Sequence, residues 1–313
     1  MPPTMSTVVA AGTVCWRERN GTVLVLVIRR DEHEDVSFPK GKVEARETLP
    51  ETAVRETREE TGLAVTLGAS LGSIEYPLPG GRGKVVHFWA AEVTDAARKA
   101  SDFTPNTEVA SIEWLPLAAA RSTLTYDHDR GVLDELAARI ERNTARTFAI
   151  MALRHGKAVP ASTWRGPDAS RPLEPLGHDQ AASIARAVAS FGPRKLVSST
   201  AARCLATIEP VSTLTGLEVK ATAAISQDAH EDGDANVERV IDKRLARAVS
   251  AVLCSHGPVL PDILDRVGAA TGAIGRRALR HASMLDTGDV AVVHVSTSQP
   301  HSIVSVETYS PAL

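Results

Sequence analysis

Three glutamates, Glu56, Glu59 and Glu60, have a spacing that would place their carboxylates on one face of a helix. Like charges this close repel each other, so the arrangement is costly unless arginines or a divalent cation offset it. Arg55 and Arg58 are arginines that could offset the repulsion, and a bound metal is the alternative. From composition alone, a solvated helix of Glu and Arg is the simpler interpretation. The stretch is therefore either a charged surface helix or a site for a metal and phosphates.

A second set of candidates follows predicted strands in the other half of the chain. Arg154 and His155 end one strand, Arg203 lies in SSTAARCLATIEP after a later strand, and His256 ends another in LCSHGPVL. Open α/β sheets bind ligands beyond the carboxyl ends of their strands, so we expect these side chains to converge in one site.

The elements around both sets divide the chain near residue 146. The first part reads strand, loop, helix (about 49–61, behind a Thr48 to Glu51 capping-box pattern) and several strands, with a helix at about 130–142. After a short polar linker, strands and helices alternate, which predicts a mostly parallel sheet flanked by helices. We expect an α/β protein with domains at 1–146 and 147–313.

Bulk properties narrow the class of protein. A chain of 313 residues favours two domains, and 43% hydrophobic with 23% charged residues is typical of globular proteins. The net charge of −3 argues against a nucleic-acid scaffold or a basic membrane-binding surface, and the longest aliphatic run, residues 23–28, is too short to span a bilayer. Cys15, Cys204 and Cys254 form no CxxC pair or zinc spacing, which suits a reducing cytoplasm.

The order Gly, Glu, Arg-Glu, Glu-Glu and Gly-Leu across residues 41–63 resembles the Nudix box. Thr57 is the one departure, because the family usually has an aliphatic residue there. The resemblance covers residues 5 to about 140 and implies an α/β/α sandwich with a mixed sheet. It also implies Mg²⁺, with Mn²⁺ as a substitute. The implied metal ligands are Glu56, Glu59, Glu60 and a backbone carbonyl near Lys40 and Gly41.

The same resemblance implies further roles in this part of the chain. Glu56 or a later acid would deprotonate the attacking water, and Arg55 with Glu47 would fix the helix to its loop. Glu108, in NTEVASIEWL, is the candidate for the later acid and a further metal ligand, since the segment resembles the diadenosine-polyphosphate hydrolase branch. Glu113 is the weaker candidate, and an ordinary loop acid is the alternative reading of Glu108.

Lys40 and Lys42 flank the box glycine in FPKGK, which resembles the dinucleoside-polyphosphate and diphosphoinositol branches. In those branches the lysines grip a long polyphosphate, and two ammonium groups beside a metal site suit a substrate with three or more phosphates. Tyr126, in LTYDHDRGVL, could stack on a base or pack as an ordinary tyrosine.

The RHG, S…RxxxT and SHG patterns together resemble the histidine phosphatase superfamily, with a phosphoglycerate-mutase-like α/β fold over about residues 148–313. Within this superfamily, the sequence most resembles the short phosphohistidine phosphatase-like branch. By this resemblance His155 attacks phosphorus, Arg154 and Arg203 clamp the phosphoryl oxygens, and His256 stabilises the transition-state charge.

A general acid for the second site is harder to place. The segment AISQDAHEDG, where larger relatives carry one, offers Asp228 and Glu231, and neither stands out. The alternative is that this domain is an inactive scaffold.

A Nudix domain ahead of a histidine phosphatase domain resembles the actinobacterial MutT-type two-domain hydrolases. The resemblance implies Mg²⁺-dependent hydrolysis of 8-oxo-dGTP and 8-oxo-GTP to the diphosphate, and hydrolysis of diadenosine polyphosphates. It implies a cytoplasmic enzyme that binds nucleotides rather than nucleic acids or membranes, and a homo-oligomer is compatible with it. One alternative is a dedicated dinucleoside or inositol polyphosphate hydrolase. Another is a nucleotide-binding sensor with an inactive C-terminal docking module, against which the intact glutamates and the pair His155 and His256 argue.

Overall fold

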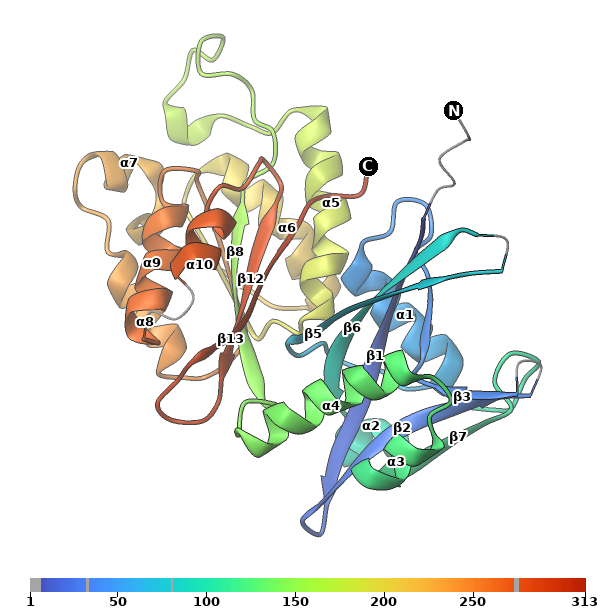
Figure 1. Cartoon of the computed structure of the whole chain (residues 1–313). Helices are drawn as coiled ribbons and strands as arrows, with labels where there is room; N and C mark the ends of the chain where they lie inside the picture. The colour runs from blue at the N-terminus through green and yellow to red at the C-terminus, as the bar shows by residue number, and fades with distance from the viewer. Residues whose placement is uncertain (1–6, 32–33, 80, 273–275) are drawn as a thin grey trace. The chain divides into compact units, whose positions relative to one another are not determined.

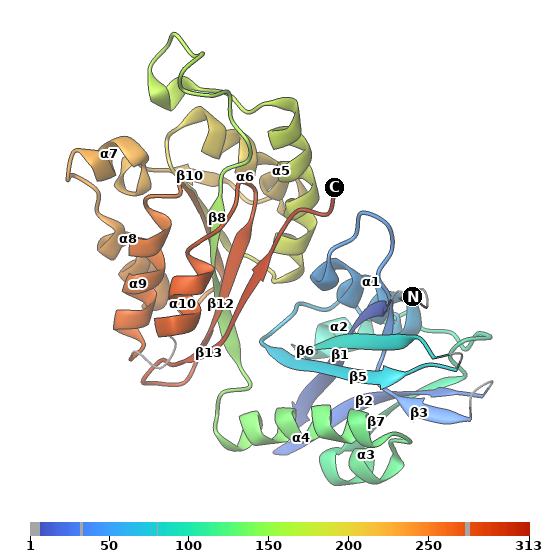
Figure 2. The same cartoon turned by 45° about the horizontal axis from the view of Figure 1, so that its top comes forward.

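A computed structural model of the chain describes residues 7–31, 34–79, 81–272 and 276–313. The chain forms two compact units, Met1–Ala145 and Arg146–Leu313. Each unit has a sheet with helices packed against it (Figures 1 and 2).

The first unit is built on a mixed sheet. Its strands have the order β3-β2-β1-β6-β5, with β4 beside β1 and β7 beside β2. Strands β1 and β6 run parallel, and the other pairs are antiparallel. The elements are β1 Val8–Arg19, β2 Thr22–Arg30, β3 Asp35–Ser37, β4 Lys40–Lys42, α1 Leu49–Thr61, β5 Ser70–Pro77, β6 Gly83–Glu92, α2 Asp95–Lys99, β7 Ser111–Pro116, α3 Leu117–Thr123 and α4 Asp127–Glu141.

Both faces of this sheet are covered, because alternate residues of its central strands are apolar on each side. On one face Val14 of β1 belongs to a buried cluster with Leu136 of α4. On the other face Leu26 of β2 belongs to a cluster with Leu63, which follows Gly62 at the end of α1. Helices α1 and α4 thus enclose the sheet, and the predicted α/β/α sandwich with a mixed sheet is confirmed (Figure 2).

The second unit has a largely parallel sheet with the order β10-β9-β11-β8-β12-β13. The first four strands run parallel, and β12 and β13 are antiparallel to their neighbours. The elements are β8 Thr147–Arg154, η1 Asp168–Ser170, α5 Pro175–Ser190, β9 Lys195–Ser198, α6 Ala202–Thr215, β10 Val219–Ala221, η2 Ala223–Ile225, α7 Gln227–Glu231, α8 Val237–Leu245, β11 Ala251–Ser255, α9 Leu260–Ala270, α10 Arg276–Ala282, β12 Val290–Ser296 and β13 Ile303–Tyr309.

Helices cover both faces of the second sheet as well. Ile150 and Leu253 of the sheet form one core with Ile241 of α8 and Ile263 of α9. Helices α5 and α6 lie on the opposite face (Figure 1). The predicted α/β class with helices on a mostly parallel sheet is therefore confirmed.

The helix expected at about 130–142 is α4, Asp127–Glu141. Strand β10 ends after three residues, at Ala221. Thr222 and Ser226 stop that strand, because their hydroxyls accept hydrogen bonds from the backbone N–H groups of Ala224 and Ala229. Such local bonds favour turns and helix starts over a strand.

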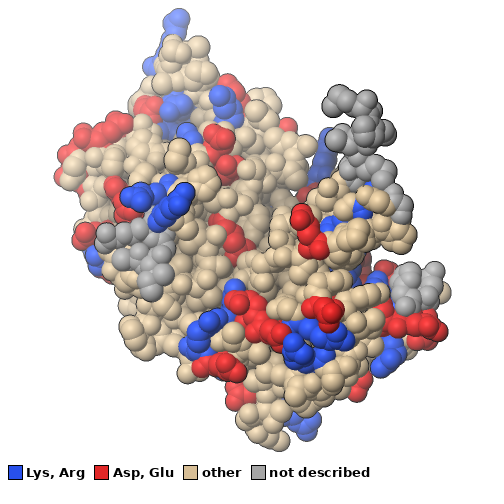
Figure 3. Space-filling model, viewed as in Figure 1, with Lys and Arg blue, Asp and Glu red and all other residues tan. Residues whose placement is uncertain are grey.

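Positive and negative side chains are interspersed on the face of the molecule shown in Figure 3. This face presents no large field of one sign that would attract a polyanion. Among the residues that the structure describes, no helix is long and apolar enough to cross a membrane.

Two candidate active sites

Helix α1 begins and ends where its flanking residues predict. Pro50 lies in its first turn, and the side chain of Glu51 accepts a hydrogen bond from the Thr48 N–H at 3.4 Å. Gly62 adopts the left-handed conformation with φ of 69°, and its N–H donates to the Arg58 carbonyl at 2.8 Å. Glycine enters this conformation at low cost, which fixes the end of the helix.

Gly41 brings the β4 backbone into contact with the carboxylate of Glu56. Strand β4 pairs with β1, with Gly41 opposite Ala11. A Cβ atom on Gly41 would lie 1.9 Å from the Glu56 carboxyl carbon, which is far inside van der Waals contact. Only glycine at position 41 allows the Glu56 carboxylate to lie this close to the β4 backbone.

Arg55 joins helix α1 to the preceding loop. Its guanidinium donates to both carboxylate oxygens of Glu47, at 2.7 and 2.9 Å, and to the Lys42 carbonyl at 3.0 Å. It also donates to Glu56 at 2.8 Å and to Glu59 at 2.9 Å. The bidentate pair with Glu47 fixes the loop to the helix, and the other two bonds hold carboxylates that would otherwise repel each other.

Glu60 is the most buried carboxylate of this group, with 3% of its surface exposed. One oxygen accepts from the Lys40 backbone N–H at 2.7 Å, and the other has no hydrogen-bond partner among the described residues. Burial raises the pKa of Glu60 to about 8; Lys40 opposes the rise, and the charges of Glu56 and Glu108 add to it. Glu60 is a buried carboxylate short of positive charge.

Glu56 and Glu108 belong to the same electrostatic group. Burial raises the pKa of Glu56; Arg55 opposes the shift, while Glu59 and Glu108 increase it. Glu108 is exposed in the loop before β7, and its charge acts on both buried carboxylates. Glu113 lies on β7 opposite Val27.

The donor set of this group is suited to a divalent cation. Carboxylate oxygens are the ligands that Mg²⁺ and Mn²⁺ prefer, and the unpartnered oxygen of Glu60 is one such ligand. Across the described ranges, no three His, Cys, Asp or Glu side chains already converge in a metal-binding arrangement. Arg55 accounts for part of this, because it draws Glu56 and Glu59 toward its own guanidinium. The chemistry of the residues fits a metal.

Thr57, the departure from the Nudix pattern, is fully buried against β1. Its hydroxyl donates to the Ala53 carbonyl at 2.7 Å and lies 2.7 Å from the Thr13 hydroxyl. A buried hydroxyl is tolerated when it is hydrogen-bonded, so Thr13 makes threonine acceptable at an otherwise aliphatic position.

The two lysines of FPKGK lie in different environments. Lys42 is exposed, whereas Lys40 is 6% exposed and its ammonium donates to the Ser37 hydroxyl at 3.1 Å and the Phe38 carbonyl at 3.3 Å. The Lys40 side chain is thus held within the unit, and its charge acts on Glu60.

Lys84 is a further cation in this region that sequence reasoning missed. Burial, followed by repulsion from Lys40, Arg30 and Lys42, lowers the pKa of Lys84 to about 8. Four positive groups therefore lie close enough to influence one another beside the acidic helix. Lys84 is the second residue of β6, and no motif marks it in the sequence.

Next to these cations three aromatic rings lie parallel. The rings of Tyr76 and His128 are 4.6 Å apart at 5°, and those of His128 and Tyr126 are 5.1 Å apart at 7°. Lys84 lies over the outer ring, 5.9 Å from the Tyr76 centroid. The neighbouring Asp129 is fully buried, and burial raises its pKa against the effect of Lys40. Parallel rings of this kind provide a face on which a flat base can stack.

In the second unit, the predicted residues meet at the carboxyl edge of the sheet. Strands β9, β11 and β8 are neighbours and run parallel. His155 follows β8, His256 follows β11, and Arg203 lies in the first turn of α6, just after β9. The rings of the two histidines are 5.2 Å apart. Residues separated by about a hundred positions in sequence are thus brought into one site.

Hydrogen bonds fix the tautomer of His155. Its Nδ1 lies 2.8 Å from the Gly156 carbonyl, which can only accept, so Nδ1 carries the proton. Its Nε2 accepts from Arg203 Nε at 3.3 Å and is therefore the atom with the lone pair. Burial, with repulsion from Arg203, Arg154 and Arg171, lowers the pKa of His155 to about 4. His155 is neutral near pH 7, with Nε2 available as a nucleophile.

His256 is held in the opposite tautomer. Its Nδ1 accepts from Arg203 Nη2 at 3.1 Å, which leaves the proton on Nε2, 2.8 Å from the Ser199 hydroxyl. Burial lowers the pKa of His256 to about 3, and the charge of Arg203 adds to the effect.

The remaining predicted clamp, Arg154, lies beside the same loop ends. Its guanidinium carbon is 3.4 Å from the Cβ position of Gly257, and its Nη1 donates to the Leu285 carbonyl. Thr207 ties the site together, since its hydroxyl accepts from the Gly156 N–H at 2.9 Å and donates to the Arg203 carbonyl at 2.6 Å.

The structure also brings residues into this site that sequence reasoning missed. Asp168 accepts from Arg203 Nη2 and from Arg171 Nε, at 2.8 and 2.6 Å. Neither predicted acid has a comparable contact: Glu231 accepts from Gln227, whose Oε1 is 3.3 Å from Arg203, and Asp228 lies in the first turn of α7. The missed residues belong to the loop between β8 and α5. In the sequence, only the length of this loop after the RHG pattern indicates that it could reach the site.

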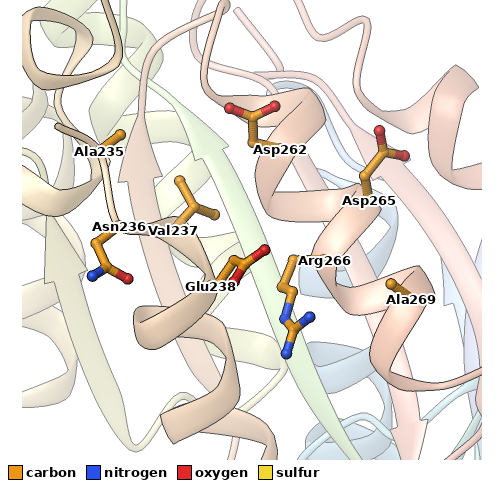
Figure 4. A pocket seen from close by; sticks show the side chains of 8 residues that line it. All are labelled: Ala235, Asn236, Val237, Glu238, Asp262, Asp265, Arg266 and Ala269. Carbon is orange, nitrogen blue, oxygen red and sulfur yellow. The ribbon is translucent and has the colours of Figure 1, made fainter. Parts of the chain in front are cut away.

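A pocket of about 630 Å³ lies between α8 and α9 of the second unit (Figure 4). Asp262, Asp265 and Arg266 line one side and Glu238 the other. No candidate catalytic residue lines it, so we assign the chemistry to the two sites above.

Comparison with known proteins identifies both halves. The NUDIX domain family matches residues 6–136, and the histidine phosphatase superfamily (branch 1) matches residues 150–229. The protein named 8-oxo-(d)GTP phosphatase from Mycolicibacterium smegmatis is 34% identical over 268 residues, which cover 83% of this chain and 80% of that protein.

Solved structures match each half separately. The Ap4A hydrolase of C. elegans, in a binary complex, matches 44% of this chain and 99% of its own, at 24% identity and a TM-score of 0.40. The protein histidine phosphatase SixA, complexed with tungstate, matches 52% of this chain and 97% of its own, at 19% identity and a TM-score of 0.41.

Proposed function

The chain belongs to the two-domain family that joins a Nudix hydrolase domain to a histidine phosphatase domain, and from this premise we propose a substrate and a chemistry for each half. Residues 1–146 hydrolyse oxidised purine nucleoside triphosphates, 8-oxo-dGTP and 8-oxo-GTP, to the diphosphate, and also cleave diadenosine polyphosphates. Residues 147–313 act as a histidine phosphatase. The name of the Mycolicibacterium smegmatis relative supports the first substrate class.

One observation carries the proposal for the first unit: the buried Glu60 carboxylate has an oxygen without a hydrogen-bond partner among the described residues. Burial also raises the pKa of Glu60 and of the half-buried Glu56. Nudix hydrolases generally need a divalent metal, and we assign Mg²⁺, with Mn²⁺ as a substitute. Glu56, Glu59, Glu60 and Glu108 would hold it, together with a backbone carbonyl at Lys40 or Gly41. When bound, it offsets charge on the phosphate oxygens and makes water a better nucleophile.

The other residues of the first unit bind and orient the substrate. Lys42 and Lys84 attract the phosphate chain, and Lys40 sets the position of Glu60 through its backbone N–H. Glu56 takes the proton from the attacking water, since a raised pKa makes it a stronger base than an ordinary carboxylate. The exposed ring of Tyr126, at the end of the stack with His128, provides the face on which the base stacks.

In the second unit, His155 Nε2 attacks the terminal phosphorus of a phosphomonoester. The Nε2–P bond forms, the bond from phosphorus to the leaving oxygen breaks, and the leaving group departs with the electron pair. Arg154 and Arg203 bind the phosphoryl oxygens, and His256 stabilises their charge. Water then hydrolyses the phosphohistidine and releases phosphate. The orientation of His155 by the Gly156 carbonyl carries this assignment.

The cytoplasm is the compartment that we assign to the protein. The three cysteines are buried free thiols, as expected in a reducing compartment. Nucleotides are the partners assigned here, rather than nucleic acids or membranes.

A substrate panel tests the proposal. The panel contains 8-oxo-dGTP, dGTP, diadenosine tetraphosphate, an inositol pyrophosphate and ADP-ribose, each with Mg²⁺ in ¹⁸O-labelled water. Mass spectrometry of the products identifies the phosphorus that water attacks. We expect 8-oxo-dGTP to be cleaved to its diphosphate and diadenosine tetraphosphate to be cleaved more slowly.

A second candidate function follows from the cations around Lys84, which would suit a dedicated dinucleoside or inositol polyphosphate hydrolase. That reading predicts fast cleavage of the longer phosphate chains and negligible cleavage of 8-oxo-dGTP. Binding of nucleotides without any turnover would instead favour a sensor.

A further inference from the structure

The clamp residue Arg203 has its donors engaged by other parts of the chain. It is fully buried. Its Nε donates to His155, its Nη1 donates to the Asp168 backbone carbonyl at 2.8 Å, and its Nη2 faces the Asp168 carboxylate, Gln227 and His256 at 2.8, 3.3 and 3.1 Å. The two N–H bonds of Nη2 thus face three acceptors. A phosphoryl group can therefore bind Nη2 only if one of these acceptors leaves.

Asp168 is the acceptor that can leave. It lies on the short helix η1 in the loop between β8 and α5, and 38% of its side chain is exposed. His256, in contrast, is fully buried. Asp168 is also the only one of the Arg203 partners named above that carries a negative charge, so a phosphoryl group would replace one anion by another.

A second arginine completes the anion site. Arg171 Nε donates to the other oxygen of the Asp168 carboxylate at 2.6 Å, and its Nη1 donates to the Val159 carbonyl at 2.7 Å. Two guanidinium groups thus hold one carboxylate from two sides. This is the arrangement with which arginines bind the oxygens of a phosphoryl group.

We propose that the Asp168 carboxylate occupies the phosphoryl position between Arg203 and Arg171, and that the substrate must displace it. The inference rests on the proposed phosphatase function of the second unit and adds to it the displacement of a built-in anion. A terminal phosphoryl group with two negative charges gains one charge over the carboxylate that it replaces, beside three arginines. A phosphodiester with one negative charge gains none. The site therefore selects terminal phosphomonoester groups and rejects diesters.

The opposite role for Asp168 would be to hold the two arginines in place for the substrate. The two roles predict opposite signs for one measurable quantity, the affinity for inorganic phosphate. Removal of a competing anion strengthens phosphate binding, because the binding-competent state is then always populated. Removal of a supporting group weakens it.

The experiment measures phosphate binding by isothermal titration calorimetry of the full chain, with EDTA present. In Asp168→Asn we expect phosphate to bind about tenfold more tightly than in the wild type. Asp168→Glu, which keeps the anion, should bind as the wild type does. Glu174→Gln is the matched control: it removes one charge from the same loop, and in the described part of the chain the Glu174 side chain makes no hydrogen bond or ion pair with an arginine of the site.

Dimethyl phosphate serves as the diester probe in the same titrations. The wild type should prefer inorganic phosphate over dimethyl phosphate by a larger factor than Asp168→Asn does. Thermal melting checks that each variant is folded, and Asp168→Ser replaces Asp168→Asn if the latter is not. Because Asp168 contributes its backbone carbonyl to Arg203 in every variant, that contact is preserved.

Equal or weaker phosphate binding in folded Asp168→Asn or Asp168→Ser would overturn the inference. Binding requires no turnover, so this result is separable from the proposed function. Tighter phosphate binding without any phosphohistidine would support the displacement of Asp168 and contradict the proposed phosphatase function. Phosphorylated His155 together with unchanged phosphate affinity would support the phosphatase function and contradict the displacement of Asp168.

Discussion

The two sites handle phosphate with opposite electrostatics. In the first unit, carboxylates crowd onto helix α1, and burial raises the pKa of Glu60 to about 8. In the second, burial and arginines lower the pKa of His155 to about 4. Burial disfavours the charged form in both cases, so it moves an acid up and a base down. In the first site one oxygen of Glu60 has no hydrogen-bond partner among the described residues, whereas the second site contains Arg154, Arg203 and Arg171.

Under the proposed function, this contrast separates the two chemistries. The carboxylate site would act on anhydride bonds with a cation that offsets its own charge and that of the substrate. The histidine site needs a neutral ring nitrogen, and its hydrogen bond to the Gly156 carbonyl provides one. Each prediction below alters one side of this contrast and leaves the other unchanged.

The largest effect is expected for Glu60→Gln. The substitution keeps the shape and removes the buried charge, so Mg²⁺-dependent triphosphate hydrolysis should fall by about a hundredfold. Mg²⁺ should also raise the melting temperature of the variant less than that of the wild type, because ligand binding stabilises the folded state. Glu59→Gln should act in the same direction.

Glu44→Gln is the matched control for these variants. Glu44 is exposed in the same loop, and among the described residues its side chain makes no hydrogen bond or ion pair with the carboxylate group. The assignment of Glu60 is untenable if Glu60→Gln and Glu44→Gln hydrolyse triphosphates at similar rates.

Gly41→Ala should displace Glu56 without unfolding the protein. The new Cβ atom would overlap the Glu56 carboxylate, which is the mobile end of a side chain and can move away. Since a misplacement of about 1 Å can lower the rate by up to about a hundredfold, we expect a loss of about tenfold or more in kcat. Steady-state kinetics and thermal melting measure the two quantities.

Gly131→Ala provides the control for Gly41→Ala. Gly131 lies in α4 with open space around its Cβ position, so alanine should leave activity unchanged and stabilise the helix slightly. A large loss of stability in Gly41→Ala, with activity per folded molecule unchanged, would argue against the role of this glycine.

A smaller effect is expected for the lysines. Lys42→Ala and Lys84→Ala should each reduce kcat/KM about tenfold for diadenosine tetraphosphate and triphosphates, since each removes one ion pair with the phosphate chain. ADP-ribose, with two phosphates, should be affected less. A competition assay with all three substrates in one reaction measures the ratios of kcat/KM. An equal loss of kcat/KM for all three substrates would contradict selection for long phosphate chains and indicate a general effect of charge.

The smallest effect is a difference in stability with pH. With EDTA present, the folded first unit keeps a proton on Glu60 between its ordinary pKa of 4.5 and about 8, so its stability should rise as the pH falls through this range. In the second unit, the pKa of His155 falls from 6.5 to about 4 and that of His256 to about 3. The unfolded chain then binds protons that the folded unit does not, and stability should fall as the pH drops below about 6.5.

Amide hydrogen exchange distinguishes the two units. Protection in the core of β1 should increase relative to that in the core of β8 as the pH falls from about 7.5 to about 5, after correction for intrinsic rates. A parallel change in both strands would contradict the opposite pKa shifts.

The sequence predicts the first site well because that site is local. Residues 41–63 contain the glycine, the arginine and the glutamates within one loop and one helix, so spacing alone sets their geometry. The contacts of Arg55 with Glu47 are those that the resemblance to the Nudix box implies. Lys84 and Asp129 were missed because they reach the site only through the sheet and α4, and local periodicity carries no information on that packing.

The second site shows where such reasoning ends. His155, Arg203 and His256 each follow a strand, and strand ends can be recognised in a sequence. Asp168 and Arg171 belong to a loop whose path depends on the bond from Asp168 to Arg203. No propensity or spacing predicts that path, so the sequence names Asp228 and Glu231 as candidate acids and does not mark Asp168 as part of the site.

The most direct test of the account is one EDTA-treated sample in which both chemistries are followed. The wild type is incubated with 8-oxo-dGTP and its diphosphate, and with p-nitrophenyl phosphate in parallel. The reactions are quenched in base, and phosphorylated peptides are identified by mass spectrometry. The account predicts that triphosphate hydrolysis falls to background while His155 carries a phosphoryl group, and that His155→Ala loses this group but hydrolyses triphosphates normally once Mg²⁺ is restored. Triphosphate hydrolysis that survives EDTA, or the absence of phosphorylated His155 with every substrate, would contradict it.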